Sequence, residues 1–471
     1  MGDTQLVDLG LEEAARAVAA REVSSVELTT ACLDRMETVG ARLNVAAFFD
    51  RDAALGAARE ADADLAANGP RGPLHGVPLA HKDLYYRAGR ESACGSALMA
   101  GFVPDYTATA LTRLDQAGAL DIARINMVEF ALGTTGHNSF SGNVLNPWNP
   151  GYVSGGSSSG SGAAVAARTI YGSLGSDTGG SVRLPASACG LVGTKPSAGR
   201  VSRHGVMPLC STFDTVGPLT RTVRDAALML NVLAGHDPQD PTSLDLPVLD
   251  YLASIEDGID GLRIAVPENF FFDPVTDDVR LVLDDSIRNF ERAGATIVTV
   301  TIPKIEIANP MTTVIVISEA ATLHREWLTT RRDEYGAQTY TRLLPGLMMP
   351  AAHYVEALNL RRPVLAAFND AVFARADLLF APTIPIPVPS YEEMGEVGSE
   401  AFMATIVALG HCSRPFNYLG LPTVSVPAGF ADNGLPVGFQ LAGRPFDEAL
   451  VFRAARAYER ETGCTDPAPD I

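Results

Sequence analysis

Two serines and one lysine stand at spacings that could carry out hydrolysis. Ser157 lies in a serine- and glycine-rich tract, and Ser181 lies 24 positions later in the stretch Gly-Ser-Asp-Thr-Gly-Gly-Ser-Val-Arg. Lys82 precedes Ser157 by 75 positions. One hydroxyl can attack a carbonyl, the second can relay its proton and a neutral amine can accept it, so no histidine is required. The pattern predicts a serine hydrolase whose catalytic residues are Lys82, Ser157 and Ser181.

The residues just before Ser181 favour a cluster of backbone donors. Gly179 and Gly180 have no Cβ and can adopt the dihedral angles that align consecutive N–H groups. We therefore predict an oxyanion hole made by the amides of Thr178, Gly179, Gly180 and Ser181. Loss of one such donor typically costs about 3 to 4 kcal/mol of transition-state stabilisation. Without the neighbouring motifs, the same glycines would indicate only a tight turn.

Three further residues of these motifs, Ser158, Asp177 and Arg183, are expected to support the site. Asp177 and Arg183 bracket the nucleophile loop, where an ion pair or hydrogen bonds to the backbone would lock its shape, because buried charges persist only when paired. Taken alone, two such charges would be interpreted as solvated surface residues.

Lys82 can act as a base only when its amine is neutral. A lysine has an ordinary pKa of about 10.4, and burial in an apolar setting lowers that value. The apolar residues 77–80 come directly before Lys82 and are typical of a buried strand that ends there. A lone lysine is normally a surface residue. The proposed role therefore depends on the two serine motifs.

The rest of the chain alternates between helical and strand-like patterns. Apolar residues recur at helical spacing over 11–39, with a capping box at Ser24 and Glu27. A turn-rich loop over 133–150 leads into the serine tract, and a helix is expected right after it. Further elements are a helix at 277–293 and strands at 74–84, 119–126, 262–266, 296–300, 377–382 and 423–427.

This alternation, with no repeat and no linker, predicts one large α/β domain over residues 1–471. Its central mixed β-sheet is expected to be covered by helices on both faces. The motifs define a core at about 73–240. A variable region at about 240–400 is expected to decorate that core and shape the substrate entrance.

Composition narrows the class of partner. The chain has 46% apolar residues and a formal charge of −19, with no dense basic run, so we expect no nucleic-acid partner. Its six cysteines are scattered without a C-x-x-C pair, so we expect free thiols and no metal site. No signal peptide and no apolar stretch of membrane-spanning length is recognisable. We expect a cytoplasmic protein without a membrane span.

The motifs resemble those of the amidase signature family, over the stretch from Gly155 to Pro196. Further landmarks are Gly76-Val77-Pro78 before Lys82-Asp83, Asn146-Pro147-Trp148-Asn149, Asp214-Thr215-Val216-Gly217-Pro218 and Leu435-Pro436-Val437-Gly438-Phe439-Gln440. The resemblance implies the amidase signature fold, with Ser181 as the acyl-enzyme nucleophile. It also implies Ser157 as a relay serine on a cis peptide bond, Lys82 as the base, and no metal or organic cofactor.

The substrate is less fixed than the reaction. We expect a small-molecule amide that is neutral and apolar or aryl, or a carbamate, with Tyr85, Tyr86 and Phe140 as walls of an apolar acyl pocket. A homodimer is left open. The alternative within the family is a glutamine-hydrolysing amidotransferase subunit that supplies ammonia to a partner.

Two departures argue against glutamine. Glutamine-using relatives carry Gln after the arginine of the nucleophile loop, where this chain has Leu184. They also carry an acidic residue upstream of a Pro-x-Asn-x-x-Gly-Leu-Pro stretch, where this chain reads Gly410-His411-Cys412-Ser413-Arg414-Pro415.

A rival enzyme class is the α/β-hydrolase, because Gly156-Ser157-Ser158-Ser159-Gly160 matches G-x-S-x-G with Ser158 at its centre. A nucleophile elbow of that kind should follow a buried strand. The residues before this tract instead favour a loop, and the scheme leaves the Ser181 motif unused.

Overall fold

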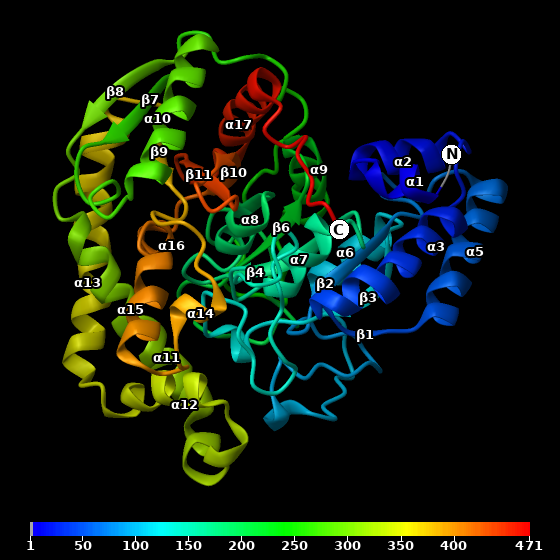
Figure 1. The fold of residues 1–471 in the computed structure, drawn as a ribbon, viewed down its shortest axis with the longest axis horizontal. Helices are drawn as coiled ribbons and strands as arrows, with labels where there is room; N and C mark the ends of the chain where they lie inside the picture. Colours follow the sequence, from blue (N-terminus) through cyan, green and yellow to red (C-terminus); the bar gives the residue numbers. More distant parts are fainter. Residues whose placement is uncertain (1–2) are drawn as a thin grey trace.

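An eleven-stranded mixed sheet runs through the computed structural model, which describes residues 3–471 (Figure 1). Its strand order is β1-β3-β2-β4-β6-β5-β10-β11-β9-β7-β8. The strands are β1 (Ala46–Phe49), β2 (Pro78–Lys82), β3 (Leu120–Ile125), β4 (Gly172–Asp177), β5 (Val192–Lys195), β6 (Thr215–Thr220), β7 (Arg263–Pro267), β8 (Thr296–Val300), β9 (Leu378–Pro382), β10 (Thr423–Phe430) and β11 (Pro436–Ala442).

The sheet combines parallel and antiparallel pairs. Strand β2 pairs in parallel with β3 and β4, and β7 pairs in parallel with β8 and β9. Between these two groups, β4, β6, β5, β10, β11 and β9 pair antiparallel to one another in that order. The predicted mixed sheet in a single α/β domain is confirmed.

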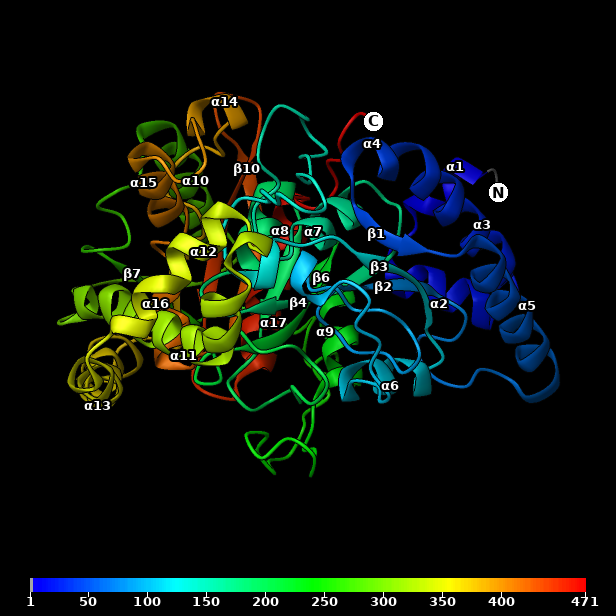
Figure 2. The same cartoon turned by 90° about the horizontal axis from the view of Figure 1, so that it is seen from below.

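Helices cover both faces of the sheet, as predicted. Helices α7 and α8 pack on one side of β4 and β6, and α9 and α17 pack on the other (Figure 2). The helices are α1 (Asp3–Asp8), α2 (Leu11–Ala19), α3 (Ser25–Arg35), α4 (Ala41–Leu43), α5 (Arg51–Asn68), α6 (Thr109–Gln116), α7 (Ser159–Ala166), α8 (Arg183–Cys189), α9 (Val223–Leu233), α10 (Asp277–Arg292), α11 (Ala308–Thr330), α12 (Ala337–Leu343), α13 (Ala351–Phe368), α14 (Tyr391–Met394), α15 (Glu400–Leu409), α16 (Arg414–Leu419) and α17 (Glu448–Thr462).

Helix α7 shows how the serine tract reaches the core. All eight of its residues are buried, and its sequence contains only small side chains and one valine. A Cβ at Gly160 would lie 2.4 Å from the Asn126 carbonyl oxygen, and one at Gly162 would lie 2.9 Å from the Pro185 side chain. The small residues therefore allow α7 to approach the sheet and α8 closely, which places the tract before it at the centre of the molecule.

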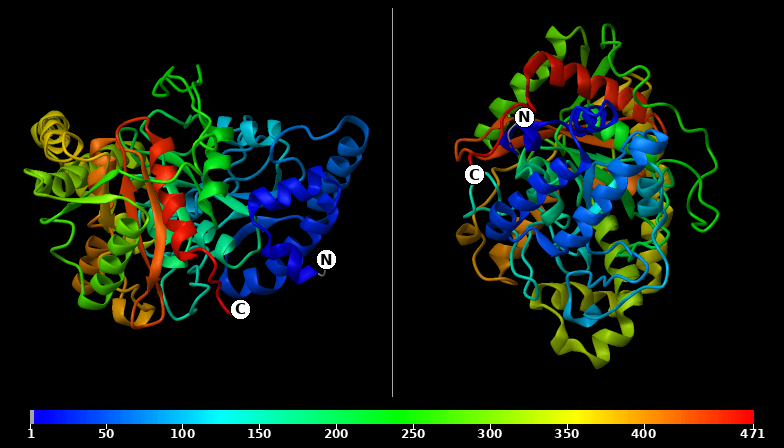
Figure 3. Two further views of the ribbon diagram at one scale, coloured as in Figure 1. Left: turned by 90° about the horizontal axis from the view of Figure 1, so that it is seen from above. Right: turned by 90° about the vertical axis from the view of Figure 1, so that its right-hand side faces the viewer.

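The N-terminal part of the chain begins its helices as predicted. Ser24 caps α3, with its side chain accepting from the Glu27 amide while the Glu27 carboxylate accepts from the Ser24 amide. The C-terminal residues return to this region, because Arg35 donates a hydrogen bond of 3.3 Å to the Ile471 carbonyl (Figure 3).

The segment over about 240–400 does more than decorate the core. It supplies the strands β7, β8 and β9 to the sheet and the helices α10 to α13 around its far end (Figure 1). The ranges 262–266, 296–300 and 377–382, which the sequence predicts as strands, each contain or overlap a strand of the structure.

Candidate active site

Lys82 ends strand β2 with its amine enclosed in the protein. The residue is fully buried, and its Nζ donates to Ser157 Oγ at 2.7 Å and to Ser176 Oγ at 2.9 Å. Ser176 lies on the neighbouring parallel strand β4. Burial lowers the pKa of the Lys82 amine to about 7, although the charges of Asp214 and Asp177 oppose the shift. A substantial neutral fraction is therefore present near pH 7, as a general base requires.

The serine tract and the nucleophile loop lie against each other. The Gly156–Ser157 peptide bond is cis, and the Ser157 carbonyl accepts from the Val128 amide at 3.1 Å. The Ser158 amide donates to the Ser181 carbonyl at 3.2 Å. Ser181 is 7% exposed. No hydrogen bond joins Ser157 Oγ to Ser181 Oγ within residues 3–471, and such contacts often tighten only when substrate is bound.

A buried ion pair fixes the nucleophile loop. Arg183 and Asp177 are both fully buried, and Arg183 Nη2 donates to Asp177 Oδ1 at 2.9 Å. Burial alone would raise the pKa of the Asp177 carboxyl, but Arg183 holds it well below its ordinary value. The same guanidinium donates to Asn417 Oδ1 and Gln440 Oε1, each at 2.7 Å. Every charge here is paired and hydrogen-bonded, so the loop keeps one shape.

One member of the predicted oxyanion hole is already engaged. The Gly180 amide donates to Asp177 Oδ1 at 2.9 Å, so it is not free to bind a substrate oxygen. The amides of Thr178, Gly179 and Ser181 make no such bond in the described part of the chain. Gly180 instead serves the turn, since its φ is +122° and a Cβ there would lie 2.3 Å from Ser413 Oγ.

A small cavity of about 80 Å³ lies over Ser181. Backbone and small side chains form most of its wall, and two arginines, Arg342 from α12 and Arg414 from α16, complete it. Its remaining lining is Ala131, Leu132, Gly133, Thr134, Thr178, Gly179, Leu209, Thr312, Thr313, Val316 and Ile317.

The predicted aromatic walls lie elsewhere. Tyr85 donates its hydroxyl to the Gly175 carbonyl at 2.6 Å and lines a different pocket, beside His81 and Phe48. Phe140 is 52% exposed at the surface, and Tyr86 packs against Phe102. None of the three lines the Ser181 cavity, so the expected apolar acyl pocket is replaced by one that contains two cations.

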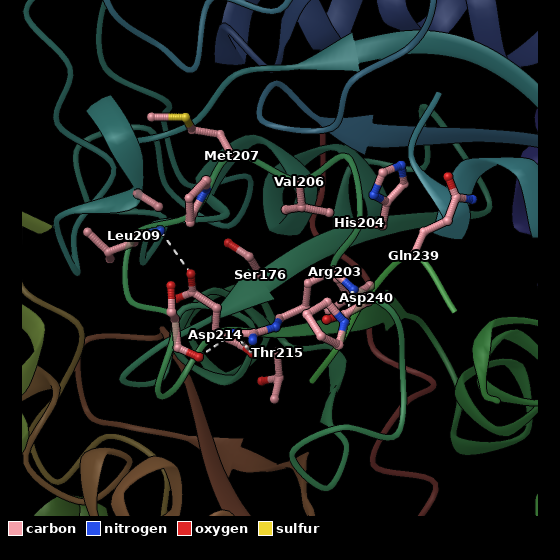
Figure 4. A pocket seen from close by; sticks show the side chains of 15 residues that line it. Ser176, Arg203, His204, Val206, Met207, Leu209, Asp214, Thr215, Gln239 and Asp240 are labelled. Atoms are coloured by element: carbon pink, nitrogen blue, oxygen red, sulfur yellow. Dashed lines mark hydrogen bonds between the residues drawn. The ribbon is translucent and has the colours of Figure 1, made fainter. Parts of the chain in front are cut away.

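A second cavity of about 240 Å³ adjoins the first and shares Ala131 and Leu209 with it. Figure 4 shows Ser176 pointing toward this cavity, with Asp214 on its wall. Asp214 accepts from Thr178 Oγ1 at 2.5 Å and from the amides of Leu209 and Cys210. The hydroxyl that contacts Lys82 therefore lies at the boundary between the base and a wider chamber.

Comparison with known proteins decides the family. The family described as Amidase matches residues 27–452. The chain belongs to the amidase family. Among curated proteins, this amidase is similar to a glutamyl-tRNA(Gln) amidotransferase subunit from Myxococcus xanthus (strain DK1622), with 40% identity over 481 residues that cover 97% of this chain and 98% of the relative.

Solved structures share the fold. An inhibitor-bound protein from work on a vestigial complex and the origins of an s-triazine catabolic enzyme matches with a TM-score of 0.90 and 31% identity, covering 98% of this chain and 99% of that one. A bacterial aryl acylamidase of the amidase signature family matches with a TM-score of 0.87 and 27% identity, covering 98% of both chains. The amidase signature fold is thereby established for this chain.

The family assignment removes the α/β-hydrolase interpretation of Ser158. The nearest strand before the tract, β3, ends at Ile125, so no strand leads into a nucleophile elbow. Ser158 is buried just before α7, and its hydroxyl donates to the Ser176 carbonyl at 3.4 Å while accepting from the Ser176 amide. The residue thus ties the tract to β4, which suits its expected supporting role.

Other expectations concern metals, thiols and membranes. Among the described residues, no group of three or more His, Cys, Asp or Glu side chains is arranged to hold a metal ion. All six cysteines are free thiols. No helix in the described range 3–471 combines the length and apolarity that a membrane crossing demands.

Sequence reasoning missed several residues of this amidase site. Ser176 stands inside the quoted motif, one position before Asp177, and its small polar side chain on a buried strand is a usable signal. Gln440 also stands in a quoted landmark. Arg342 and Arg414 lie in segments without a motif, and only the fold brings them to Ser181.

Proposed function

We propose that this amidase hydrolyses the carbon–nitrogen bond of a small carboxamide through an ester on Ser181. The observation that carries the proposal is the buried Lys82 amine, 2.7 Å from Ser157 Oγ, with a pKa of about 7. A neutral amine at this place can take the proton of Ser157, which in turn takes the proton of Ser181 as its oxygen attacks. Ser181 thereby gains nucleophilic character without a histidine.

The proton then travels back to the leaving group. As the tetrahedral intermediate collapses, the carbon–nitrogen bond breaks and the nitrogen takes a proton from Ser157, which recovers it from Lys82. The amides of Thr178, Gly179 and Ser181 are the donors available for the oxyanion. Water attacks the resulting ester along the same proton route, and the free acid and Ser181 are released.

We further propose that the substrate belongs to the glutamine type rather than to apolar anilides. The relative with 40% identity is named as a glutamyl-tRNA(Gln) amidotransferase subunit, whereas the aryl acylamidase has 27% identity. A cavity of about 80 Å³ with two arginines also suits a short polar acyl group better than an aryl one. If the chain functions within such a complex, its partner is a protein that consumes the ammonia.

Labelling with a fluorophosphonate followed by peptide mass spectrometry tests the chemistry. We expect the label on Ser181 and its loss in Lys82→Ala. Label on Ser158, or unchanged labelling of Lys82→Ala, would overturn the mechanism. Ammonia release from glutamine, compared with aniline release from acetanilide, tests the substrate type, and faster acetanilide hydrolysis would overturn it.

A further inference from the structure

Two arginines line the Ser181 cavity without an acidic partner. Arg342 Nη1 donates to the Leu132 carbonyl at 2.9 Å, and Arg414 Nη2 donates to the Ile406 carbonyl at 3.4 Å. Neither forms an ion pair within residues 3–471, although other arginines near the sheet, such as Arg183, do. Each guanidinium has further N–H donors that these two bonds leave unused.

This arrangement is costly for the empty site. Burial lowers the pKa of both guanidinium groups to about 10, and the charge of Arg414 lowers that of Arg342 further. Two like charges that share one desolvated cavity repel each other, and an unpaired buried charge is destabilising. An anion between them would relieve both effects. A carboxylate fits the planar donors of arginine with two parallel hydrogen bonds.

The cavity offers nothing comparable to a cation. No Asp or Glu is among its lining residues in the described structure. Asp214 lines the adjoining cavity, and it already accepts three hydrogen bonds from Thr178, Leu209 and Cys210. An ammonium group on the substrate would therefore meet two guanidinium ions and no carboxylate.

Gly410 explains how Arg414 occupies this place. An added Cβ at Gly410 would lie 2.9 Å from Arg414 Nη2 and 3.0 Å from Arg414 Nε. The guanidinium thus packs on the bare backbone of Gly410, in the segment where an acidic residue is absent. Absence of a side chain and presence of a second cation are two sides of one local change.

From these contacts we infer that Arg342 and Arg414 form a carboxylate subsite, and that the substrate is a short amide that carries a carboxylate but no ammonium. The chemical class is the monoamide of a small dicarboxylic acid. This inference rests on the proposed function, because it describes the far end of the amide that Ser181 attacks. It narrows the glutamine type to its carboxylate and removes its amino group from recognition.

Three amides separate the contributions of the two charges. Glutaramate carries the carboxylate alone, glutamine carries the carboxylate and the ammonium, and butyramide carries neither. We expect kcat/KM to fall at least tenfold from glutaramate to glutamine and again to butyramide. Equal values for glutaramate and butyramide would overturn the carboxylate subsite, and a higher value for glutamine would overturn the exclusion of the ammonium.

Variants locate the effect on the two side chains. Arg342→Gln and Arg414→Gln should each raise the KM for glutaramate at least tenfold and change butyramide hydrolysis less than twofold. Arg362→Gln, an exposed position on α13, is the matched control and should leave both substrates unchanged. Equal losses on glutaramate and butyramide would show that the arginines support only the fold.

Binding to a variant that cannot turn over substrate separates this inference from the mechanism. Ser181→Ala should bind glutaramate, measured by calorimetry, at least tenfold more tightly than its Arg342→Gln double variant. This result does not depend on acyl-enzyme formation, so it stands even if labelling places the nucleophile elsewhere. Equal affinity of the two variants would overturn the subsite.

A change at Gly410 provides a gain of function. Gly410→Asp places a carboxylate beside Arg414, whereas Gly410→Ala adds only bulk at the same position. We expect the ratio of kcat/KM for glutamine over glutaramate to rise at least tenfold in Gly410→Asp relative to Gly410→Ala. An unchanged ratio would contradict the electrostatic argument.

Discussion

Two lysines on the central sheet share a pKa but differ in their contacts. Lys82 ends β2 and Lys195 ends β5, both are buried, and burial lowers the pKa of each amine to about 7. Lys82 Nζ contacts the hydroxyls of Ser157 and Ser176. Lys195 Nζ donates to the Pro196 carbonyl at 3.0 Å, which offers no proton. Burial supplies a neutral amine at both places, but only one of them has a hydroxyl to deprotonate.

The largest effect should follow from removal of the Lys82 amine. Lys82→Ala leaves Ser157 without a proton acceptor, so we expect kcat/KM to fall by about 10⁴-fold, as for other members of catalytic triads. Ammonia release under single-turnover conditions measures this loss. A decrease below tenfold would place the base elsewhere.

The next effect concerns the ion pair that lies near both lysines. Asp177→Asn leaves Arg183 buried without its counter-charge, and we expect the free energy of unfolding to fall by about 3 to 5 kcal/mol. Urea unfolding measures it. The control is Asp285→Asn, because the Asp285–Arg288 pair is more than half exposed and should contribute less than about 1 kcal/mol. Similar losses in the two variants would contradict the structural role of the buried pair.

Asp177→Asn should also sharpen the comparison of the amines. The negative charge of Asp177 raises the pKa of both lysines, against the effect of burial. Its removal should therefore move the pH limb of activity to lower pH.

A smaller effect should follow from the second contact of Lys82. Ser176→Ala removes one hydrogen bond to the amine, which is worth about 1 kcal/mol, so we expect kcat to fall by about tenfold or less with little change in KM. Because this hydroxyl contacts the base itself, the pH limb should shift while Ser176→Thr restores it. A change confined to stability would show that Ser176 only packs the strand.

The smallest effect is expected at Lys195. Lys195→Met replaces the buried amine with an apolar chain of similar length, and activity should stay within about twofold of the unaltered protein because no hydroxyl relay is lost. Steady-state ammonia release measures this. A large loss would break the distinction drawn between the two lysines.

The fold class and the catalytic trio could be predicted because local signals carry them. The apolar run before Lys82 and the small residues of α7 both specify a buried element, and the structure contains both. Strand β4 could not be predicted, since Gly-Ser-Leu-Gly-Ser-Asp lacks the β-branched residues typical of strands. Its burial between β2 and β6 comes from tertiary packing.

The acyl side of the site could not be predicted in the same way. Arg342 and Arg414 stand 72 positions apart on two short helices, and no local pattern relates them. The availability of the Gly180 amide likewise depends on the orientation of the Asp177 carboxylate. Charge in a pocket and donors already in use are properties of the folded chain, so an expectation of aromatic walls arose from residues that pack elsewhere.

The pH dependence of Ser181 acylation by a fluorophosphonate tests the central claim most directly. Because the neutral amine is the base, the rate should rise with pH through an apparent pKa of about 7 and then level off. This limb should persist in Lys195→Met and vanish in Lys82→Ala. A limb that survives the loss of Lys82, or disappears with Lys195, would contradict the account.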